Sequence, residues 1–378
     1  VARRDGGLHR PVLDRLEILG NPVDERVPVP AEFVERHVVA LGHLQVVPRE
    51  LRGGWIRSVR RRPPYRRTHL VPAGPSFRAA PVRVRVPATS ANLGPGFDAF
   101  GLALGLYDDV LVRVADSGLH VDVAGEGADE VDRGKKNLVV RSARAAFDAL
   151  GGQPRGLEII CANRIPHGRG LGSSAAAIVA GITAARALVL GGMTDDEALE
   201  LACALEGHPD NVAACLRGGA TIAWRDSASA PVGVLRLEPH KSLRAIALVP
   251  VTKLSTAKAR RLLPESVPHA DAAANSGRAA LLTEALTRRP DLLLPATRDL
   301  LHQDYRAPAM PRSAAVLRAL RDAGIAATIS GAGPAVLALL VDGDPLSRER
   351  VEAAVPKGWS ALELDVDRGG AVVVPLEG

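Results

Sequence analysis

The segment 166–176 has the sequence Pro166-His-Gly-Arg-Gly-Leu-Gly-Ser-Ser-Ala-Ala176, and an alanine-rich apolar pattern follows it. Its three glycines lack a Cβ, so consecutive backbone N–H groups can turn toward one centre. The start of the helix predicted over 171–190 adds partial positive charge. Ser173 and Ser174 add two hydroxyl groups at that point. The combination predicts a cradle for the phosphates of a nucleotide.

Two common phosphate-binding motifs do not fit this segment. No Gly-Lys-Ser/Thr follows the glycines, as it would in the common P-loop, and the glycine spacing differs from that of the dinucleotide fingerprint. A glycine-rich helix start that serves only close packing is the structural alternative. The spacing alone leaves both interpretations open.

The segments around this loop predict a mixture of strands and helices. Val82–Val86 alternates with arginines, as a half-buried strand does. Thr194 and Glu197 have the spacing of a capping box at the start of a helix. The other predicted strands are 110–114, 119–123, 157–161, 232–237, 244–250, 325–329 and 335–341, and the other predicted helices are 137–150, 255–263, 271–288 and 313–323. This mixture predicts α+β layers rather than a regular βαβ series.

The length of 378 residues suits two domains with extra segments. With 47% hydrophobic and 24% charged residues, the composition is that of a globular protein. The polar connection near 238–243 is the best candidate for a domain boundary. We therefore expect a leader over 1–75, an N-terminal domain over 76–238 and a C-terminal domain over 239–378.

The net charge of +6 belongs to the leader, because residues 1–75 contain 14 arginines and 8 acidic residues, while the rest is neutral overall. Its densest arginine run comprises Arg57, Arg60, Arg61, Arg62, Arg66 and Arg67. Such a run can bind phosphate backbones, but a neutral body without interleaved aromatics makes nucleic-acid binding the weaker interpretation. We expect a disordered arm, or a leader that is not natively translated, since the chain begins with Val1.

The three cysteines, Cys161, Cys203 and Cys215, lack metal-ligand spacing, and their odd number fits a disulfide framework poorly. Reduced thiols and a cytoplasmic location are therefore expected. The apolar stretch near 175–185 ends at Arg186 and is too short to span a bilayer. We expect no membrane partner.

Three motifs occur in the order found in the GHMP kinases, the superfamily of galacto-, homoserine, mevalonate and phosphomevalonate kinases. The segment 166–176 resembles its nucleotide motif. The segment Thr89-Ser-Ala-Asn-Leu-Gly-Pro-Gly-Phe-Asp98 resembles the first motif in its homoserine kinase form, and Ser330-Gly-Ala-Gly-Pro334 resembles the third. The resemblance covers roughly residues 80–340. It implies the two-domain GHMP kinase fold, with a ribosomal protein S5 domain 2-like N-terminal domain and a ferredoxin-like C-terminal domain.

On the nucleotide side, the resemblance implies ATP and Mg²⁺ as cofactors. Glu206 resembles the magnesium ligand, and we place Ser174 beside it, because carboxylate and hydroxyl oxygens suit a hard cation. Asn137 resembles an adenine-side contact, although its position at a predicted helix start equally fits an N-cap. The predicted nucleotide-binding residues are Pro166, His167, Gly168, Arg169, Gly170, Leu171, Gly172, Ser173, Ser174, Ala175, Ala176 and Asn137.

On the substrate side, the resemblance implies a pocket for L-homoserine. Asn92 and Asp98 resemble contacts to its hydroxyl and amino end, and Arg260 and Arg306 resemble the arginines that fork onto its carboxylate. A carboxylate suits an ammonium group, and guanidinium groups suit a carboxylate. Thr256 resembles a hydroxyl near the transferred phosphate. The predicted catalytic and substrate residues are Asn92, Asp98, His208, Asn211, Thr256, Arg260 and Arg306.

Two assignments stay open from the sequence. Arg261 adjoins Arg260, and either residue could face the pocket. Asp210 is a candidate general base, whereas transfer without a strong base would pass the hydroxyl proton to a phosphate oxygen.

The activity implied by the resemblance is ATP-dependent phosphorylation of the L-homoserine hydroxyl to O-phospho-L-homoserine, a step of threonine biosynthesis. One alternative is another small-molecule kinase of the superfamily, of the mevalonate type. A second is a sensor that binds ATP without transferring its phosphate. The sequence leaves open whether the protein forms a homodimer.

Overall fold

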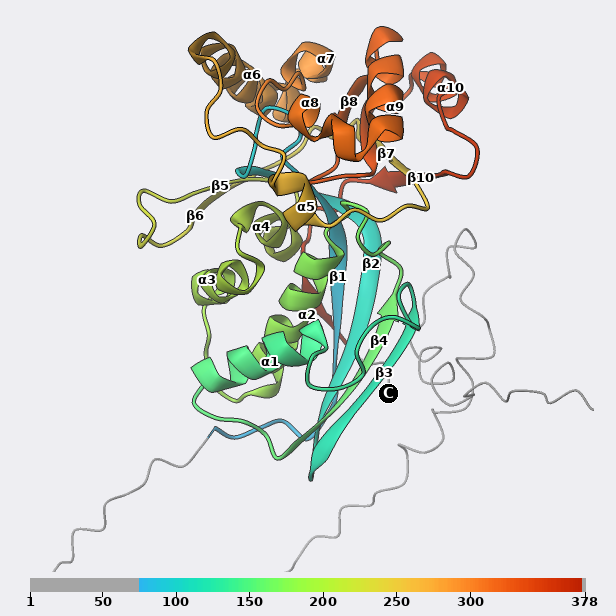
Figure 1. Cartoon of the computed structure of the whole chain (residues 1–378). Coiled ribbons are helices and arrows are strands. Elements are labelled where there is room, and N and C mark those ends of the chain that lie inside the picture. The colour runs from blue at the N-terminus through green and yellow to red at the C-terminus, as the bar shows by residue number, and fades with distance from the viewer. Residues whose placement is uncertain (1–74, 376–378) are drawn as a thin grey trace, which may run out of the picture. The chain divides into compact units, whose positions relative to one another are not determined.

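The computed structural model describes residues 75–375, which form one compact unit (Figure 1). The predicted leader lies outside this range apart from its last residue, so the expectations for it stay predictions. The strands are β1 Val82–Ala91, β2 Phe100–Ala115, β3 Gly118–Gly125, β4 Gly156–Asn163, β5 Ala220–Trp224, β6 Gly233–Leu237, β7 Leu243–Val249, β8 Ala326–Ile329, β9 Val336–Val341, β10 Ser360–Asp365 and β11 Val372–Val374. The helices are α1 Leu138–Ala149, α2 Ser173–Leu188, α3 Asp195–Glu206, α4 Pro209–Arg217, α5 Thr256–Arg260, α6 His269–Thr287, α7 Leu293–Ala296, α8 Gln303–Arg306, α9 Pro311–Asp322 and α10 Pro345–Ala353.

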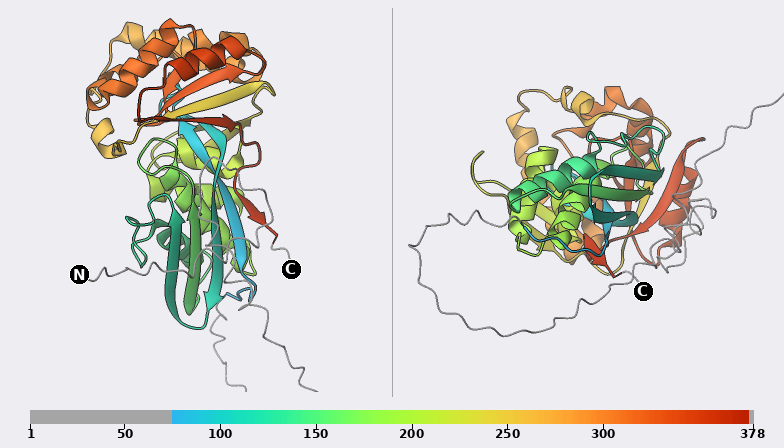
Figure 2. Two further views of the ribbon diagram at one scale, coloured as in Figure 1. Left: turned by 90° about the vertical axis from the view of Figure 1, so that its right-hand side faces the viewer. Right: turned by 90° about the horizontal axis from the view of Figure 1, so that it is seen from below.

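The first sheet has seven strands in the order β11-β1-β2-β4-β3, with β5 paired to β2 and β6 paired to β5. The pair β3–β4 is parallel, while the other pairs are antiparallel. Helices α1 to α4 gather on one side of this sheet (Figures 1 and 2). Helix α2 lies at their centre and can approach α1 closely, because a Cβ on its Gly181 would lie 2.5 Å from the carbonyl oxygen of Val139.

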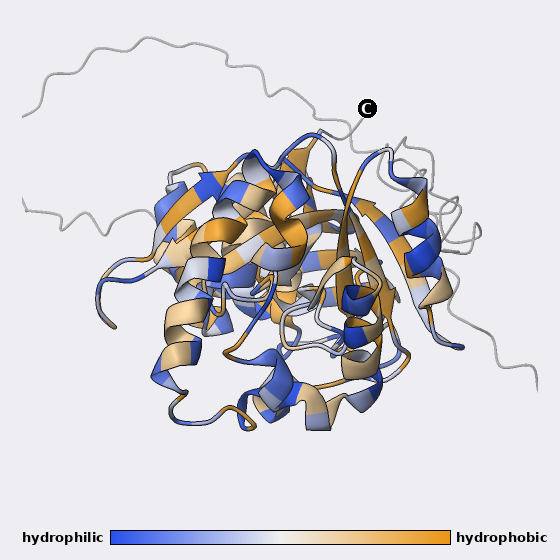
Figure 3. Ribbon diagram, turned by 90° about the horizontal axis from the view of Figure 1, so that it is seen from above, coloured by the Kyte–Doolittle hydropathy of each residue, from blue (hydrophilic) through white to orange (hydrophobic). Residues whose placement is uncertain are grey.

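The second sheet is antiparallel in the order β10-β7-β9-β8. Side chains alternate between the two faces of β7, as in any strand. Ile246 and Leu248 join the cluster that includes buried residues of α9 and α10, whereas Ala245 and Ala247 join the large core shared with the first sheet. Figure 3 shows the strands largely in the orange of hydrophobic residues and the helices in mixed colours.

The predicted α+β mixture is confirmed, with differences at particular elements. Strand β2 begins at Phe100 rather than near 110, because it continues to pair with β1 past a bulge at Pro87/Ala88. The sequence places 206–211 at a helix C-terminus or a turn; Glu206 does end α3, and a further helix, α4, begins at once with a proline at its first position. Proline suits that position because the first helical N–H groups have no intrahelical acceptor.

The chain changes sheet between β6 and β7, near the expected connection 238–243. Strand β11 then returns to the first sheet and pairs with β1. We retain residue 238 as a proposed boundary between two domains. The three cysteines are buried and free. None of the described helices combines the length and apolar character needed to cross a bilayer.

Candidate active site

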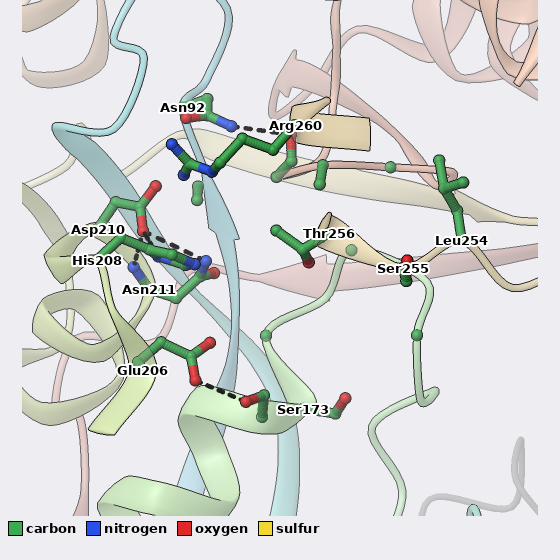
Figure 4. Close-up of a pocket in the computed structure, with 18 of the residues that line it drawn as sticks. Asn92, Ser173, Glu206, His208, Asp210, Asn211, Leu254, Ser255, Thr256 and Arg260 are labelled. Atoms are coloured by element: carbon green, nitrogen blue, oxygen red, sulfur yellow. Dashed lines mark hydrogen bonds and ion pairs between the residues drawn. The ribbon is translucent and has the colours of Figure 1, made fainter. Parts of the chain in front are cut away.

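A cavity of about 230 Å³ lies where the phosphate loop, the loop 92–98, the start of α4, the segment 254–260 and the loop 331–333 meet (Figure 4). All the residues predicted for substrate and catalysis line it, although they come from segments far apart in the sequence. They are Asn92, Asp98, His208, Asn211, Thr256, Arg260 and Arg306. Ser173, Ser174 and Glu206 line the same cavity.

The phosphate loop depends on its glycines. Gly168, Gly170 and Gly172 have φ of +68°, +86° and +74°, a region that other residues seldom adopt. A Cβ on Gly172 would lie 2.0 Å from Oγ1 of Thr89, and one on Gly170 would lie 2.3 Å from a backbone oxygen of Ser330. The glycines are therefore needed for close packing, and this does not exclude a phosphate cradle, which stays a prediction.

Helix α2 begins at Ser173, two residues later than expected, and no side chain caps its first turn. The first N–H groups of any helix lack an intrahelical acceptor, and because no side chain caps them in α2, they are available to an anion. Ser173 and Ser174 line the cavity at this end of the helix. The arrangement meets the requirements of the predicted phosphate cradle.

The remaining loop residues have different surroundings. Arg169 binds backbone oxygens of His167, Pro250 and Val251, which ties the loop to the segment after β7. Leu171, Ala175 and Ala176 are fully buried. The predicted nucleotide residues that line neither this cavity nor the next one are Pro166, Arg169, Leu171 and Ala175.

A second, more apolar cavity of about 220 Å³ adjoins the first and shares Ser173 and Ser174 with it. Asn137 lines this cavity and caps α1, because its Oδ1 accepts hydrogen bonds from the N–H groups of Val139 at 2.9 Å and Val140 at 3.4 Å. The N-cap interpretation of Asn137 is thus observed, and its predicted adenine contact stays a proposal.

Glu206 ends α3, and its carboxylate accepts a hydrogen bond from Oγ of Ser174 at 2.6 Å. Burial raises the pKa of Glu206 above its ordinary value, while the hydrogen bond from Ser174 opposes that shift. Among the described residues, no group of three or more His, Cys, Asp and Glu side chains could hold a metal. The carboxylate of Glu206 and the hydroxyl of Ser174 are oxygen donors, the kind that Mg²⁺ takes one or two of from a protein while phosphate and water complete its shell.

The loop after β1 is strained. Asn92, Leu93 and Asp98 have φ of +69°, +49° and +54°, which costs free energy for residues other than glycine. The side chain of Asn92 stabilises the loop, because its Oδ1 accepts from the N–H of Asp98 at 2.9 Å and its Nδ2 donates to the carbonyl of Gly331 at 2.8 Å. The hydrogen bond from Asn92 to Gly331 thereby joins the first motif, residues 89–98, to the third motif, residues 330–334.

Asp98 and Arg260 form a bidentate ion pair, with N–O distances of 2.7 and 2.8 Å. The hydrogen bond to Asp98 raises the pKa of Arg260. Arg260 lines the cavity and Arg261 does not, which settles the choice that the sequence left open. The two residues predicted to bind the ammonium and carboxylate groups of an amino acid are thus paired with each other.

Arg306 lies at the end of α8 and is 1% exposed, yet no carboxylate among the described residues pairs with it. Its Nη1 donates to Nδ1 of His302 at 3.2 Å and to the carbonyl of Gly331 at 3.3 Å, while its Nε has no partner. The guanidinium lies 5.2 Å from the centre of the Phe97 ring, and that of Arg260 lies 5.8 Å from the same ring. Two guanidinium groups therefore converge on one side of the cavity.

The start of α4 carries a hydrogen-bonded chain. Asp210 accepts from Nδ1 of His208 at 2.6 Å and from the N–H of Asn211 at 2.8 Å, and Asn211 accepts from Oγ1 of Thr89 at 2.8 Å. Burial opposes a charge on His208, but the hydrogen bond and charge of Asp210 raise the pKa of His208. The chain holds three polar side chains of the cavity in fixed positions.

Some residues of the site were not predicted. Thr89 and Phe97 stood within the quoted first motif, so the motif itself was the available signal. Gly331 stood within the third motif and supplies a carbonyl to Asn92 and Arg306. His302 had no signal, because an isolated histidine before a short polar helix has no distinctive pattern.

Family models match two parts of the chain: the GHMP kinases N terminal domain over 137–219 and the GHMP kinases C terminal over 272–361. Homoserine kinase of Streptomyces coelicolor is 64% identical over 307 residues, which are 80% of this chain and 98% of that protein. The homoserine kinase of Streptomyces avermitilis is 63% identical, with 80% and 99% covered. The chain belongs to the homoserine kinases of the GHMP family.

Solved structures of this family agree with the fold. The homoserine kinase from Cytophaga hutchinsonii has a TM-score of 0.69 at 29% identity, covering 78% of this chain and 97% of that one. Mevalonate kinase of L. major has a TM-score of 0.57 at 17% identity, covering 78% and 97%, which shows a shared fold alone. The predicted two-domain GHMP kinase fold is confirmed.

Proposed function

We propose that this chain transfers the γ-phosphoryl group of ATP to the side-chain hydroxyl of L-homoserine and forms O-phospho-L-homoserine for threonine biosynthesis. Its membership of the homoserine kinases supports the reaction. The observation that carries the proposal is the set of charges beside the phosphate loop: the carboxylate of Asp98 and the guanidinium groups of Arg260 and Arg306 line one small cavity with Ser173 and Ser174. Two further carboxylates, Glu206 and Asp210, line the same cavity.

A zwitterion can enter this set by exchanging partners. Its ammonium group would take the place of Arg260 on Asp98, and its carboxylate would take the place of Asp98 on Arg260 while also neutralising Arg306. Each protein group that loses its protein partner thus gains an oppositely charged group of the ligand as its new partner. An anion without an ammonium group, such as mevalonate, would leave Asp98 unpaired, and an unpaired charge away from water is costly.

The phosphate loop and Glu206 would act on the nucleotide. The first N–H groups of α2 and the hydroxyl of Ser173 bind phosphate oxygens, and Ser174 and Glu206 hold Mg²⁺. The bound ion supplies neutralisation of phosphate charge. The adjoining apolar cavity, beside Asn137, suits the flat base of ATP.

The hydroxyl group of the substrate needs positioning more than a strong base. Asn92 and Thr256 line the same cavity and can hold this group near the phosphate loop. The Oδ1 of Asp210 already accepts hydrogen bonds from His208 and Asn211. We therefore propose that Asp210 holds His208 and that the hydroxyl proton passes to a phosphate oxygen. We also propose a cytoplasmic enzyme, since its three cysteines are free thiols.

ADP release measured with L-homoserine, 4-hydroxybutyrate and mevalonate tests the function. We expect turnover with L-homoserine alone, and a fall in its kcat/KM of roughly 100-fold in Asp98→Asn, as when one preorganised charged contact is lost. Asp291→Asn is the matched control, because it removes an exposed ion pair with Arg289 outside the cavity. Comparable use of mevalonate would favour the other kinase class, and ATP binding without ADP release would favour the sensor.

A further inference from the structure

His302 is a fully buried histidine that does not line the cavity. It contacts Arg306, which does line the cavity. It precedes α8 and is 0% exposed. Its two ring nitrogens have different partners: Nε2 lies 2.9 Å from the carbonyl oxygen of Gly94, and Nδ1 lies 3.2 Å from Nη1 of Arg306. The ring therefore links the loop after β1 to the guanidinium of Arg306.

These partners fix the tautomer of the ring. A carbonyl oxygen can only accept, so Nε2 of His302 must carry a proton and donate it to Gly94. A guanidinium can only donate, so Nδ1 must be unprotonated and accept from Arg306. Burial lowers the pKa of His302, while the charge of Asp299 opposes that shift and the charge of Arg306 adds to it. The ring is thus neutral with a single orientation.

The surroundings hold this ring in place. It stacks on the ring of Phe97 with centroids 5.1 Å apart and planes at 27°. The carboxylate of Asp299 accepts from the backbone N–H groups of His302 at 3.0 Å and Gln303 at 2.7 Å, which fixes the start of α8. The same Phe97 ring lies under the guanidinium of Arg306. His302 and Phe97 together leave Arg306 little freedom to turn.

We infer that His302 is a positioning residue whose neutral imidazole accepts a hydrogen bond from Arg306 and so directs that guanidinium at the carboxylate of the substrate. This inference rests on the proposed function. Arg306 lines the cavity and no carboxylate within the described residues pairs with it, so its positive charge is left for an incoming anion. A protonated ring at 302 would instead repel Arg306.

Two variants separate the two hydrogen bonds of the ring. His302→Asn can place an amide oxygen near the position of Nδ1 and keep the acceptor for Arg306. His302→Gln can place an amide nitrogen near the position of Nε2 and keep only the donor to Gly94. We expect His302→Asn to retain the KM for L-homoserine within about threefold, and His302→Gln to raise it roughly tenfold or more, as for a lost hydrogen bond to a charged group.

A substrate without a carboxylate distinguishes the loss of Arg306 positioning from general damage to the active site. We expect kcat/KM for 3-aminopropan-1-ol, and the KM for ATP, to be the same in wild type and both variants, because neither involves the group that Arg306 binds. Equal losses with both alcohols, or equal KM values for L-homoserine in the two variants, would overturn the inference.

A measurement on the unmodified protein guards against variants that fail to fold. Nitrogen-15 NMR of the histidine rings should show His302 with an unprotonated Nδ1 and a protonated Nε2 at neutral pH. The reverse tautomer, or a doubly protonated ring, would contradict the positioning role. Failure of wild type to release ADP with L-homoserine while the tautomer is as described would instead refute the proposed function and, with it, the role assigned to Arg306.

Discussion

At the scale of single residues, most side chains of the cavity are already paired with each other. Asp98 binds Arg260, and Ser174 binds Glu206. Each pair joins two groups that we expect to contact a ligand, so the ligand must replace a contact rather than fill an empty site. Arg306 differs, because its buried guanidinium has no carboxylate partner among residues 75–375. An anionic group of a ligand would therefore gain the most electrostatic stabilisation at Arg306.

Glu206→Gln tests the proposed magnesium site. The amide keeps the shape and accepts the hydrogen bond of Ser174, but it lacks the negative charge that holds a divalent cation. We expect kcat/KM to fall by roughly 100-fold and the Mg²⁺ concentration for half-maximal rate to rise. Glu200→Gln, also on α3 but paired with Arg225, is the control. An unchanged dependence on Mg²⁺ would exclude Glu206 as a ligand.

Asp108 predicts a pH dependence of stability. It is buried, lines the second cavity, and accepts from the N–H groups of Arg164 at 2.6 Å and Ile165 at 2.9 Å. Burial raises its pKa from 3.8 to about 7. Between these two values the folded chain keeps a proton that the unfolded chain releases. The stabilisation of the folded state by this proton is therefore complete below about pH 4 and is lost as the pH rises to about 7.

The free energy of unfolding should fall by up to about 1.4 kcal/mol per pH unit over that window on account of Asp108. In Asp108→Asn this part of the slope should vanish, because the amide does not titrate. Urea unfolding at pH 5, 6, 7 and 8 measures the difference, with exposed Asp148→Asn as the control. Parallel curves for wild type and Asp108→Asn would show that Asp108 does not titrate in this range.

At the scale of elements, the site is built from the beginnings of helices. Helices α2 and α4 start at the cavity, and neither has an N-cap side chain that accepts from its first turn. In α4 the carboxylate of Asp210 accepts from the N–H of Asn211 instead, so the start of α2 is the free one. A free helix start attracts negative charge. Helix α1 instead starts with Asn137 as a cap, beside the second cavity. The uncapped starts are the ones that we expect to face phosphate and substrate.

Asn137→Ala separates the capping role from the proposed adenine contact. Loss of the cap should lower the free energy of unfolding by about 1 kcal/mol. If the side chain also contacts the base, the KM for ATP rises severalfold, which is the result that we expect. Thr194→Ala removes the cap of α3, away from both cavities, and should cost similar stability with an unchanged KM for ATP. Identical KM values in the two variants would leave Asn137 as a cap alone.

At the scale of the whole molecule, one hydrophobic core joins the two sheets. It includes residues of α2 and β1 as well as Leu243, Leu337 and Leu339 of the second sheet. The cavity thus lies between two halves that share a core. The compact unit begins at Ser76.

Removal of residues 1–74 should therefore leave the kinase intact. We expect kcat and both KM values within about twofold of the full chain, since the catalytic site lies within the unit that starts at Ser76. Steady-state ADP release from both chains measures this. A tenfold loss of turnover would show that the leader contributes to the site, and salt-dependent nucleic-acid binding by the full chain alone would revive the weaker interpretation.

Sequence patterns alone predicted the family, the α+β class and nearly all of the polar side chains that line the cavity. Glycine spacing and motif order carry this information, because backbone conformations such as those of Gly170 and Gly172 restrict the residue type directly. The capping box of Thr194 and Glu197 was predictable for the same local reason, and it is present.

Tertiary packing, in contrast, sets which of two adjacent arginines faces the cavity, the ion pair of Asp98 with Arg260, and the hydrogen bond of His302 to Gly94. These contacts join residues 162 positions apart for Asp98 and Arg260, and their geometry depends on how the two sheets pack. No local pattern encodes such distances, since burial and orientation arise only when distant segments meet. Arg306 shows the difference: the sequence motif predicted its role, and the fold alone made it a buried charge without a carboxylate partner among the described residues.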